Sequence, residues 1–237
     1  MTANRLLALV TAAFMACSTA RHGVAASARP PSPADTTLLR SGTAFIVSRD
    51  GYMLTSAHVV RGCQKIEIWP GNAPPLAARL VAVDDQLDIA LLSTERMVDF
   101  AATPPAAPLK AGQAVIYTIG FGLTPSTPRV PVLTQGFFDG TTWRDGRPLL
   151  VIRARLYEGN SGGPVIDTRG ALQGMVIGRY VTRPDLSVAV RSKEIAGFLK
   201  AHGIESMSLR LRAQAGGSRS EQLSTMASLV QCAQARR

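Results

Sequence analysis

Short apolar runs, separated by glycine, proline and polar turn residues, recur along the chain from residue 38 onward. Runs of this length, rich in valine and isoleucine or alternating with polar residues, are typical of β-strands. The first two are joined by Arg49-Asp50-Gly51, which predicts a hairpin. Their spacing favours an antiparallel sandwich or barrel over alternating βα units. The runs are GTAFIVS (42–48), YMLTSAHVV (52–60), KIEIWP (65–70), ARLVAVD (78–84), DIALLS (88–93), QAVIYTIG (113–120), VLTQGFF (132–138), LLVIRAR (149–155), PVIDTRG (164–170) and ALQGMVIGRY (171–180).

Two segments near the C-terminus have helical spacing instead. KEIAGFLKAH (193–202) predicts a helix that ends at Gly203. After a polar break, residues 219–235 carry a weaker apolar stripe at helical spacing, formed by Leu223, Met226, Val230 and Ala233. We therefore expect residues 204–237 to form a tail with a short helix, and this helix to carry Cys232.

The N-terminal residues predict an exported protein. Arg5 precedes an apolar stretch that is too short to cross a bilayer comfortably and is followed by small residues suited to cleavage. We expect a signal peptide over 1–26, a linker rich in proline and serine over 27–37, and a mature chain without a transmembrane helix in the periplasm or outside the cell. Cys17 is an alternative site for a lipid anchor, but the Phe-Met-Ala before it fits a lipoprotein signal poorly.

Composition and charge narrow the classes of function. Hydrophobic residues make up 46% of the chain and aromatic residues only 5%, so aliphatic side chains must form the core. The formal charge is +10, but the arginines are scattered without a basic run or interleaved aromatics, which argues against nucleic-acid binding. The sequence has no CxxC motif or Cys/His cluster, so no metal is expected. In an oxidising compartment Cys63 and Cys232 are expected to form a disulfide.

One serine is a candidate nucleophile. Ser161 lies in EGNSGGPVID (158–167), which by itself is also what an ordinary glycine-rich turn looks like. A serine becomes nucleophilic only when a base takes its proton and a further group orients that base. His58 in TSAHVV follows a predicted strand, where a turn would expose it, and Asp88 immediately precedes the apolar run of DDQLDIALL. Either residue alone would more often be structural.

Taken in order, these segments resemble a known family. GTAFIVSRDGYMLTSAHVV, DDQLDIALL and EGNSGGPVID are similar to the corresponding segments of trypsin-like serine peptidases, in particular the bacterial HtrA/Deg-type branch. IGFGL (119–123) and LQGMVIG (172–178) extend the similarity, which covers about residues 38–200. The resemblance implies an all-β fold of two six-stranded antiparallel barrels with a C-terminal helix. It implies a peptidase domain over 38–203 with halves of about 38–105 and 106–203. No PDZ-like domain is expected after it.

The resemblance also implies roles for single residues. Ser161 would attack the scissile carbonyl, His58 would take its proton, and Asp88 would orient the imidazole. The backbone N–H groups of Gly159 and Ser161 would form the oxyanion hole. A polypeptide substrate would pair in extended conformation with Ile177, Gly178 and Arg179. The implied activity is that of a secreted serine endopeptidase that needs no cofactor.

The sequence also departs from the family pattern. Relatives often carry Asn-Pro where this chain has Tyr157-Glu158, which leaves open the shape of the specificity pocket and whether the oxyanion hole is preformed. Two other functions fit the same residues. One is a peptide-binding protein with a lapsed peptidase fold, and the other is a hydrolase of non-protein esters.

Overall fold

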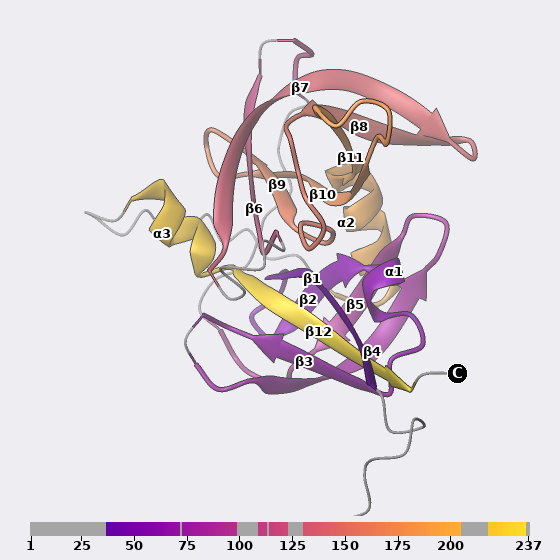
Figure 1. The fold of residues 1–237 in the computed structure, drawn as a ribbon, viewed down its shortest axis with the longest axis vertical. Helices are drawn as coiled ribbons and strands as arrows, with labels where there is room; N and C mark the ends of the chain where they lie inside the picture. The colour runs from indigo at the N-terminus through magenta and orange to yellow at the C-terminus, as the bar shows by residue number, and fades with distance from the viewer. Residues whose placement is uncertain are drawn as a thin grey trace, which may run out of the picture. The chain divides into compact units, whose positions relative to one another are not determined.

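The computed structural model describes residues 37–71, 73–98, 109–112, 114–122, 130–204 and 218–235. Twelve strands form two closed barrels of six, and the pairings within each barrel are antiparallel (Figure 1). The architecture predicted from the sequence is therefore confirmed. The expected signal peptide and almost all of the expected linker lie outside the described residues.

The first barrel is built mainly from the N-terminal half of the chain. Its strands follow one another around the barrel in the order β1-β12-β3-β4-β5-β2. A single helical turn, α1, follows β2 directly. The bounds are β1 (Thr37–Ile46), β2 (Tyr52–Ser56), α1 (Ala57–Val60), β3 (Lys65–Trp69), β4 (Leu76–Asp84), β5 (Ile89–Ser93) and β12 (Ala227–Ala235).

The second barrel is formed by consecutive strands in the order β10-β11-β8-β7-β6-β9. The predicted helix before Gly203 is present as α2, and a second helix, α3, precedes β12. The tip of the β7–β8 hairpin is a two-residue turn in which Asp145 and Gly146 both have positive φ, as a type I′ turn requires. The bounds are β6 (Val115–Gly120), β7 (Val132–Arg144), β8 (Arg147–Arg153), β9 (Pro164–Asp167), β10 (Leu172–Arg179), β11 (Leu186–Arg191), α2 (Ser192–Ala201) and α3 (Arg219–Ser224).

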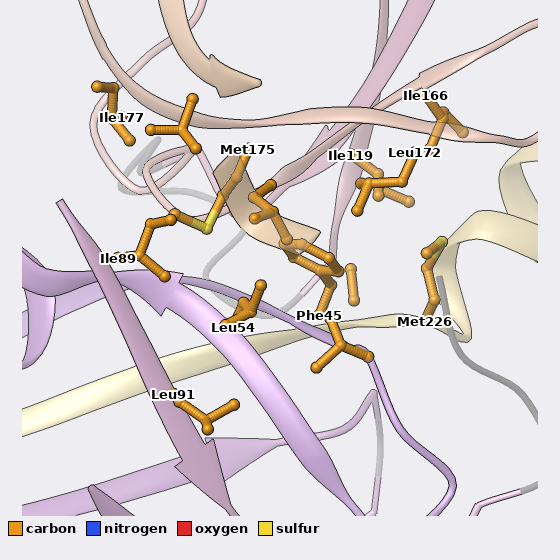
Figure 2. Close-up of a cluster of buried hydrophobic side chains, with 14 of the residues drawn as sticks. Phe45, Leu54, Ile89, Leu91, Ile119, Ile166, Leu172, Met175, Ile177 and Met226 are labelled. Carbon is orange, nitrogen blue, oxygen red and sulfur yellow. The ribbon is translucent and has the colours of Figure 1, made fainter. Parts of the chain in front are cut away.

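Aliphatic side chains fill three clusters. One includes residues from five strands of the first barrel and is packed by Leu76 and Ala78 of β4, the sixth. A second contains residues from every strand of the second barrel. The third draws on both barrels, with Phe45, Leu54 and Ile89 from the first meeting Ile119 and Met175 from the second (Figure 2). Burial of such side chains contributes about 1.5–3 kcal/mol each, so this third cluster holds the two barrels together.

The tail does not have the structure expected from its sequence. The helix ends at Ser224, and residues 227–235 form strand β12, which lies between β1 and β3 (Figure 1). The prediction of a helix carrying Cys232 was therefore wrong, as was the assignment of the whole tail outside the peptidase domain. Without β12 the facing edges of β1 and β3 would be unpaired, so pairing with two strands outweighs the weak helical stripe.

A disulfide joins this strand to the segment after α1. Cys63 and Cys232 are bonded, with their Cα atoms 5.4 Å apart and 169 residues apart in sequence. Cys232 is fully buried in β12, directly opposite Arg40 of β1 and Ile66 of β3. The bond links the strand that completes the first barrel to the chain five residues beyond His58.

Candidate active site

His58 is held by Asp88 through two hydrogen bonds. The carboxylate accepts one from the backbone N–H of His58 at 2.9 Å, and its other oxygen lies 2.7 Å from Nδ1 of the imidazole. A third bond, from Ala57 N to Asp88 O at 3.1 Å, fixes the two backbones against each other. Because a carboxylate can only accept, in the neutral imidazole Nδ1 carries the proton and Nε2 keeps its lone pair. This is the tautomer that a general base requires.

The two side chains differ in exposure. The His58 side chain is 45% exposed, whereas that of Asp88 is 13% exposed. His58 lies on the one-turn helix α1 and Asp88 at the end of the turn between β4 and β5. Asp88 also has φ of +57°, a conformation that non-glycine residues adopt only when their surroundings hold them there. The strained backbone accepts the bond from Ala57, while the carboxylate binds His58.

Ser161 follows a tight turn that depends on glycine. Tyr157 O accepts from Asn160 N at 3.1 Å, and Gly159 at the third position has φ of +91°, as in a type II turn. Gly162 has φ of +86°, and a Cβ there would collide with the backbone oxygen of Thr43. Both glycines are therefore required by the backbone, and the turn is more constrained than an ordinary loop.

The two predicted oxyanion donors are not used within the described structure. Among the hydrogen bonds of the described residues, none is donated by the backbone N–H of Gly159 or of Ser161. By contrast, the N–H groups of Asn160, Gly162 and Gly163 all have backbone acceptors, at 2.8–3.1 Å. The turn thus leaves free the two N–H groups that the family resemblance assigns to the oxyanion hole.

Strand β1 contacts both segments of the site. A Cβ at Gly42 would lie 2.8 Å from Val59, the residue after His58, and 3.1 Å from the backbone oxygen of Ser161. The next residue, Thr43, donates its N–H to the same oxygen at 2.8 Å. No hydrogen bond joins Ser161 Oγ to His58 Nε2 among the described residues. Such bonds are often long or poorly aligned before substrate is bound.

A cavity of about 590 Å³ lies beside His58 and Asp88. Ile177 lines it, together with Arg144 and Asp145 from the β7–β8 hairpin. Arg147, directly after the turn at the tip of this hairpin, donates a hydrogen bond to the side chain of Gln86 in the turn that carries Asp88. The cavity is therefore bounded by both barrels and is large enough for one or two side chains of a ligand.

The predicted substrate-binding segment lies at the end of β10. The register with β11 shifts between Val176 and Gly178, which makes Ile177 a bulge residue. Strand β9 pairs with β10 only as far as Met175, so among the described strands residues 177–179 are paired on one side only. Ile177 is buried and Arg179 is exposed. An unpaired backbone edge next to the site can accept a further strand.

Neither a metal-binding cluster nor a membrane-spanning helix occurs among the described residues. Within the described ranges, no three His, Cys, Asp or Glu side chains are grouped closely enough to hold a metal ion. The same ranges contain no helix that is long and apolar enough to span a membrane.

Sequence analysis did not single out Thr43 or the β7–β8 hairpin, because a threonine in a strand and a surface turn have no local pattern that marks them.

Two closed antiparallel barrels of six strands are the architecture of the trypsin-like peptidases, and solved structures of that class match this chain. The active form of the Rv3671c protease of M. tuberculosis has a TM-score of 0.62 and is 25% identical, covering 71% of this chain and 81% of that structure. The HtrA-type protease AlgW with a decapeptide has a TM-score of 0.61 at 23% identity, covering 68% and 51%, which supports the fold alone.

Residues 42–175 match the family model described as "Trypsin-like peptidase domain". The chain therefore belongs to this family. It is 32% identical over 168 residues to the Mycobacterium tuberculosis "Serine protease Rv3671c", covering 68% of this chain and 42% of the relative. It is 35% identical over 141 residues to a "Probable periplasmic serine endoprotease DegP-like" of Halomonas elongata, covering 56% and 28%. The chain thus spans less than half the length of these relatives, and the predicted resemblance to the HtrA/Deg branch is confirmed.

Proposed function

We propose that this protein is a secreted serine endopeptidase in which Ser161, His58 and Asp88 form the catalytic triad. Ser161 Oγ attacks the scissile carbonyl carbon while its proton passes to Nε2 of His58. Asp88 holds the imidazole in the accepting tautomer and stabilises the imidazolium that forms. The observation that carries this proposal is the single Asp88 carboxylate that binds both the backbone N–H and Nδ1 of His58.

The rest of the reaction follows from the same groups. The negative charge on the substrate oxygen is stabilised by the N–H groups of Gly159 and Ser161, which have no acceptor among the described residues. The imidazolium returns the proton to the leaving amine, the C–N bond breaks, and an ester to Ser161 forms. Water then attacks this ester with His58 again accepting the proton, which releases the carboxylic acid and regenerates the serine.

The substrate is proposed to be a polypeptide in extended conformation. Its backbone would pair with residues 177–179, whose edge away from β11 is unpaired among the described strands. The HtrA-type protease AlgW, which has a similar fold, was solved with a decapeptide. The cavity beside His58 and Asp88 would accept a side chain next to the scissile bond.

Export to an oxidising compartment is part of the proposal. The bonded pair Cys63–Cys232 requires an environment in which a disulfide persists, such as the periplasm. The periplasmic designation of the Halomonas relative agrees with this location. The predicted signal peptide would direct this export.

The decisive experiment compares wild-type protein with Ser161→Ala and His58→Ala in casein digestion and in labelling by a fluorophosphonate probe. We expect wild type to cleave casein and to be labelled, and both variants to lose cleavage by several orders of magnitude. His202→Ala is the matched histidine control, because the hydrogen bond of the His202 side chain among the described residues is to Phe198 O on α2, so the variant should keep full activity.

The same assays separate the alternatives. A wild-type protein that binds peptide but is neither labelled nor active would be a lapsed peptidase. A protein that is labelled and hydrolyses a nitrophenyl ester but leaves casein and a peptide library intact would be an esterase. Casein cleavage at the wild-type rate by purified Ser161→Ala would refute the assignment of the nucleophile.

A further inference from the structure

Thr43 of the first barrel contacts the turn of the second barrel that carries the candidate oxyanion hole. Its side chain is fully buried, and its hydroxyl donates to Gly159 O at 2.6 Å. The same hydroxyl accepts a hydrogen bond from Phe121 N at 3.0 Å, just after β6. A hydroxyl has one proton to donate, and here that proton is used on Gly159.

The backbone of Thr43 extends this contact. Its N–H donates to Ser161 O at 2.8 Å. Thr43 therefore holds the carbonyl groups of both residues whose N–H groups are the candidate oxyanion donors. It does so from strand β1, a part of the fold that is separated from this turn by 116 residues.

The bond to Gly159 fixes a peptide group that would otherwise turn easily. The carbonyl of Gly159 and the N–H of Asn160 belong to the same peptide plane, and the N–H donates to Tyr157 O at 3.1 Å. The plane is thus held on its carbonyl side by Thr43 and on its N–H side by Tyr157. Glycine adopts positive and negative φ about equally readily, so the chain itself does not hold Gly159 at +91°.

We propose that Thr43 is a positioning residue that sets the geometry of the oxyanion hole from the first barrel. This inference rests on the proposed function. Without the hydroxyl, Gly159 O is a buried acceptor with no donor, and the cheapest way to satisfy it is to rotate its peptide toward water. That rotation also turns the Asn160 N–H of the same plane away from Tyr157 O and so opens the turn that holds Gly159 at its φ of +91°. The N–H of Gly159, in the peptide plane before it, then loses its fixed direction, and an oxyanion donor acts only when it points at the developing charge.

The test uses three substitutions. Thr43→Val removes the hydroxyl and keeps the shape, whereas Thr43→Ser keeps the hydroxyl. Thr94→Val is the control, because Thr94, just after β5 in the same barrel, also donates its hydroxyl to a backbone oxygen, that of Gly51 at 3.1 Å, and no hydrogen bond of the described residues joins it to residues 157–163. All three are assayed at equal folded concentration, established by circular dichroism, on a peptide substrate that wild type cleaves.

Thr43→Val should lower kcat by about tenfold with little change in KM, a smaller loss than the 10²–10³ for removing an oxyanion donor outright. Thr43→Ser should restore most of kcat, and Thr94→Val should keep kcat. A peptide aldehyde, whose adduct with Ser161 carries an oxyanion, should bind Thr43→Val about tenfold more weakly. The corresponding peptide alcohol, which forms no adduct, should bind all variants equally.

Equal losses of kcat in Thr43→Val and Thr94→Val, or unchanged aldehyde binding, would overturn the inference while leaving the proposed peptidase intact. If wild type itself neither cleaves peptide nor binds the aldehyde, the proposed function fails. The positioning role is then decided by the crystal structure of Thr43→Val. A Gly159 peptide displaced from its wild-type orientation supports the inference, and an unchanged turn refutes it.

Discussion

Removing the disulfide should cost the protein a large part of its stability. The double variant Cys63→Ala/Cys232→Ala breaks a crosslink that closes a loop of 169 residues. In the chain-entropy model, a loop of this size contributes about 5 kcal/mol at 25 °C, by restricting the unfolded chain. Measured values are often smaller, and the alanine at the fully buried position 232 adds a small cavity cost. We therefore expect a loss of about 3–5 kcal/mol.

The native strand should survive this loss. Strand β12 keeps its pairing with β1 from residue 37 to residue 45 and its five register pairs with β3. The barrel is therefore held in place by hydrogen bonds and by Leu229 and Val230 in the cores, and the variant should still fold and cleave substrate. The loss of stability should appear as unfolding at a lower urea concentration, with the native structure unchanged.

The assay is urea unfolding of the mature protein, followed by tryptophan fluorescence, for wild type with and without reductant and for the variant. Reduced wild type and the variant should unfold at similar urea concentrations, both well below oxidised wild type. Intact-mass analysis after alkylation without reductant should find no free thiol in wild type. Two alkylated thiols there, or a stability loss below about 1 kcal/mol in the variant, would contradict the reasoning.

Three further changes test other parts of the structure. Asp88→Asn should lower kcat by about four orders of magnitude with KM little changed, because an amide cannot accept both hydrogen bonds and lets the imidazole take the wrong tautomer. Steady-state kinetics, with circular dichroism as the folding control, decides this. Gly162→Ala should destabilise the protein and abolish activity, since the φ of residue 162 is +86° and a Cβ there would meet backbone atoms. Gly197→Ala on α2, where the added Cβ would have open space around it, should be neutral or slightly stabilising in thermal unfolding. The backbone N–H of Ser218 holds the pKa of the Glu221 carboxyl below its usual range. The stability that Glu221 contributes is therefore present at pH values above the ordinary pKa of a carboxyl group and is lost as pH falls through the lowered pKa. The difference between wild type and Glu221→Ala in urea unfolding should shrink in acid, and an equal difference at neutral and acidic pH would count against this role of Glu221.

Much of the fold was predictable because its signals are local. The runs around Ile66, Leu91 and Ile119 alternate or are continuously apolar, and each forms the expected strand. The end of α2 was predictable for the same reason, because Gly203 adopts the positive φ of a helix terminator. The motifs around His58, Asp88 and Ser161 were also recognisable locally, since glycines or an apolar run stand beside each of these residues in the sequence.

What sequence reasoning missed depends on pairing over long distances. Residues 227–235 were expected to be helical, yet they form β12 between β1 and β3, which lie far away in the chain. Strand β11, which was not predicted, pairs with the preceding strand β10 and with the more distant β8. The role of Thr43 is invisible for the same reason, because its partner Gly159 is 116 residues away. A local pattern reports which face of a segment is apolar, but it does not report which strand will lie beside it.

Because of strand β12, the order in which synthesis of the two barrels begins differs from the order in which their strands are complete. The barrel that bears His58 is the first to emerge from the ribosome, yet it has only five of its six strands until residues 227–235 arrive. The second barrel, which bears Ser161, has all of its strands by residue 191. A nascent chain, or one clipped between α2 and β12 before folding, therefore carries the proposed nucleophile in a complete barrel and the proposed base in an incomplete one. On the proposed function, proteolytic competence is thereby deferred until residues 227–235 have been synthesised.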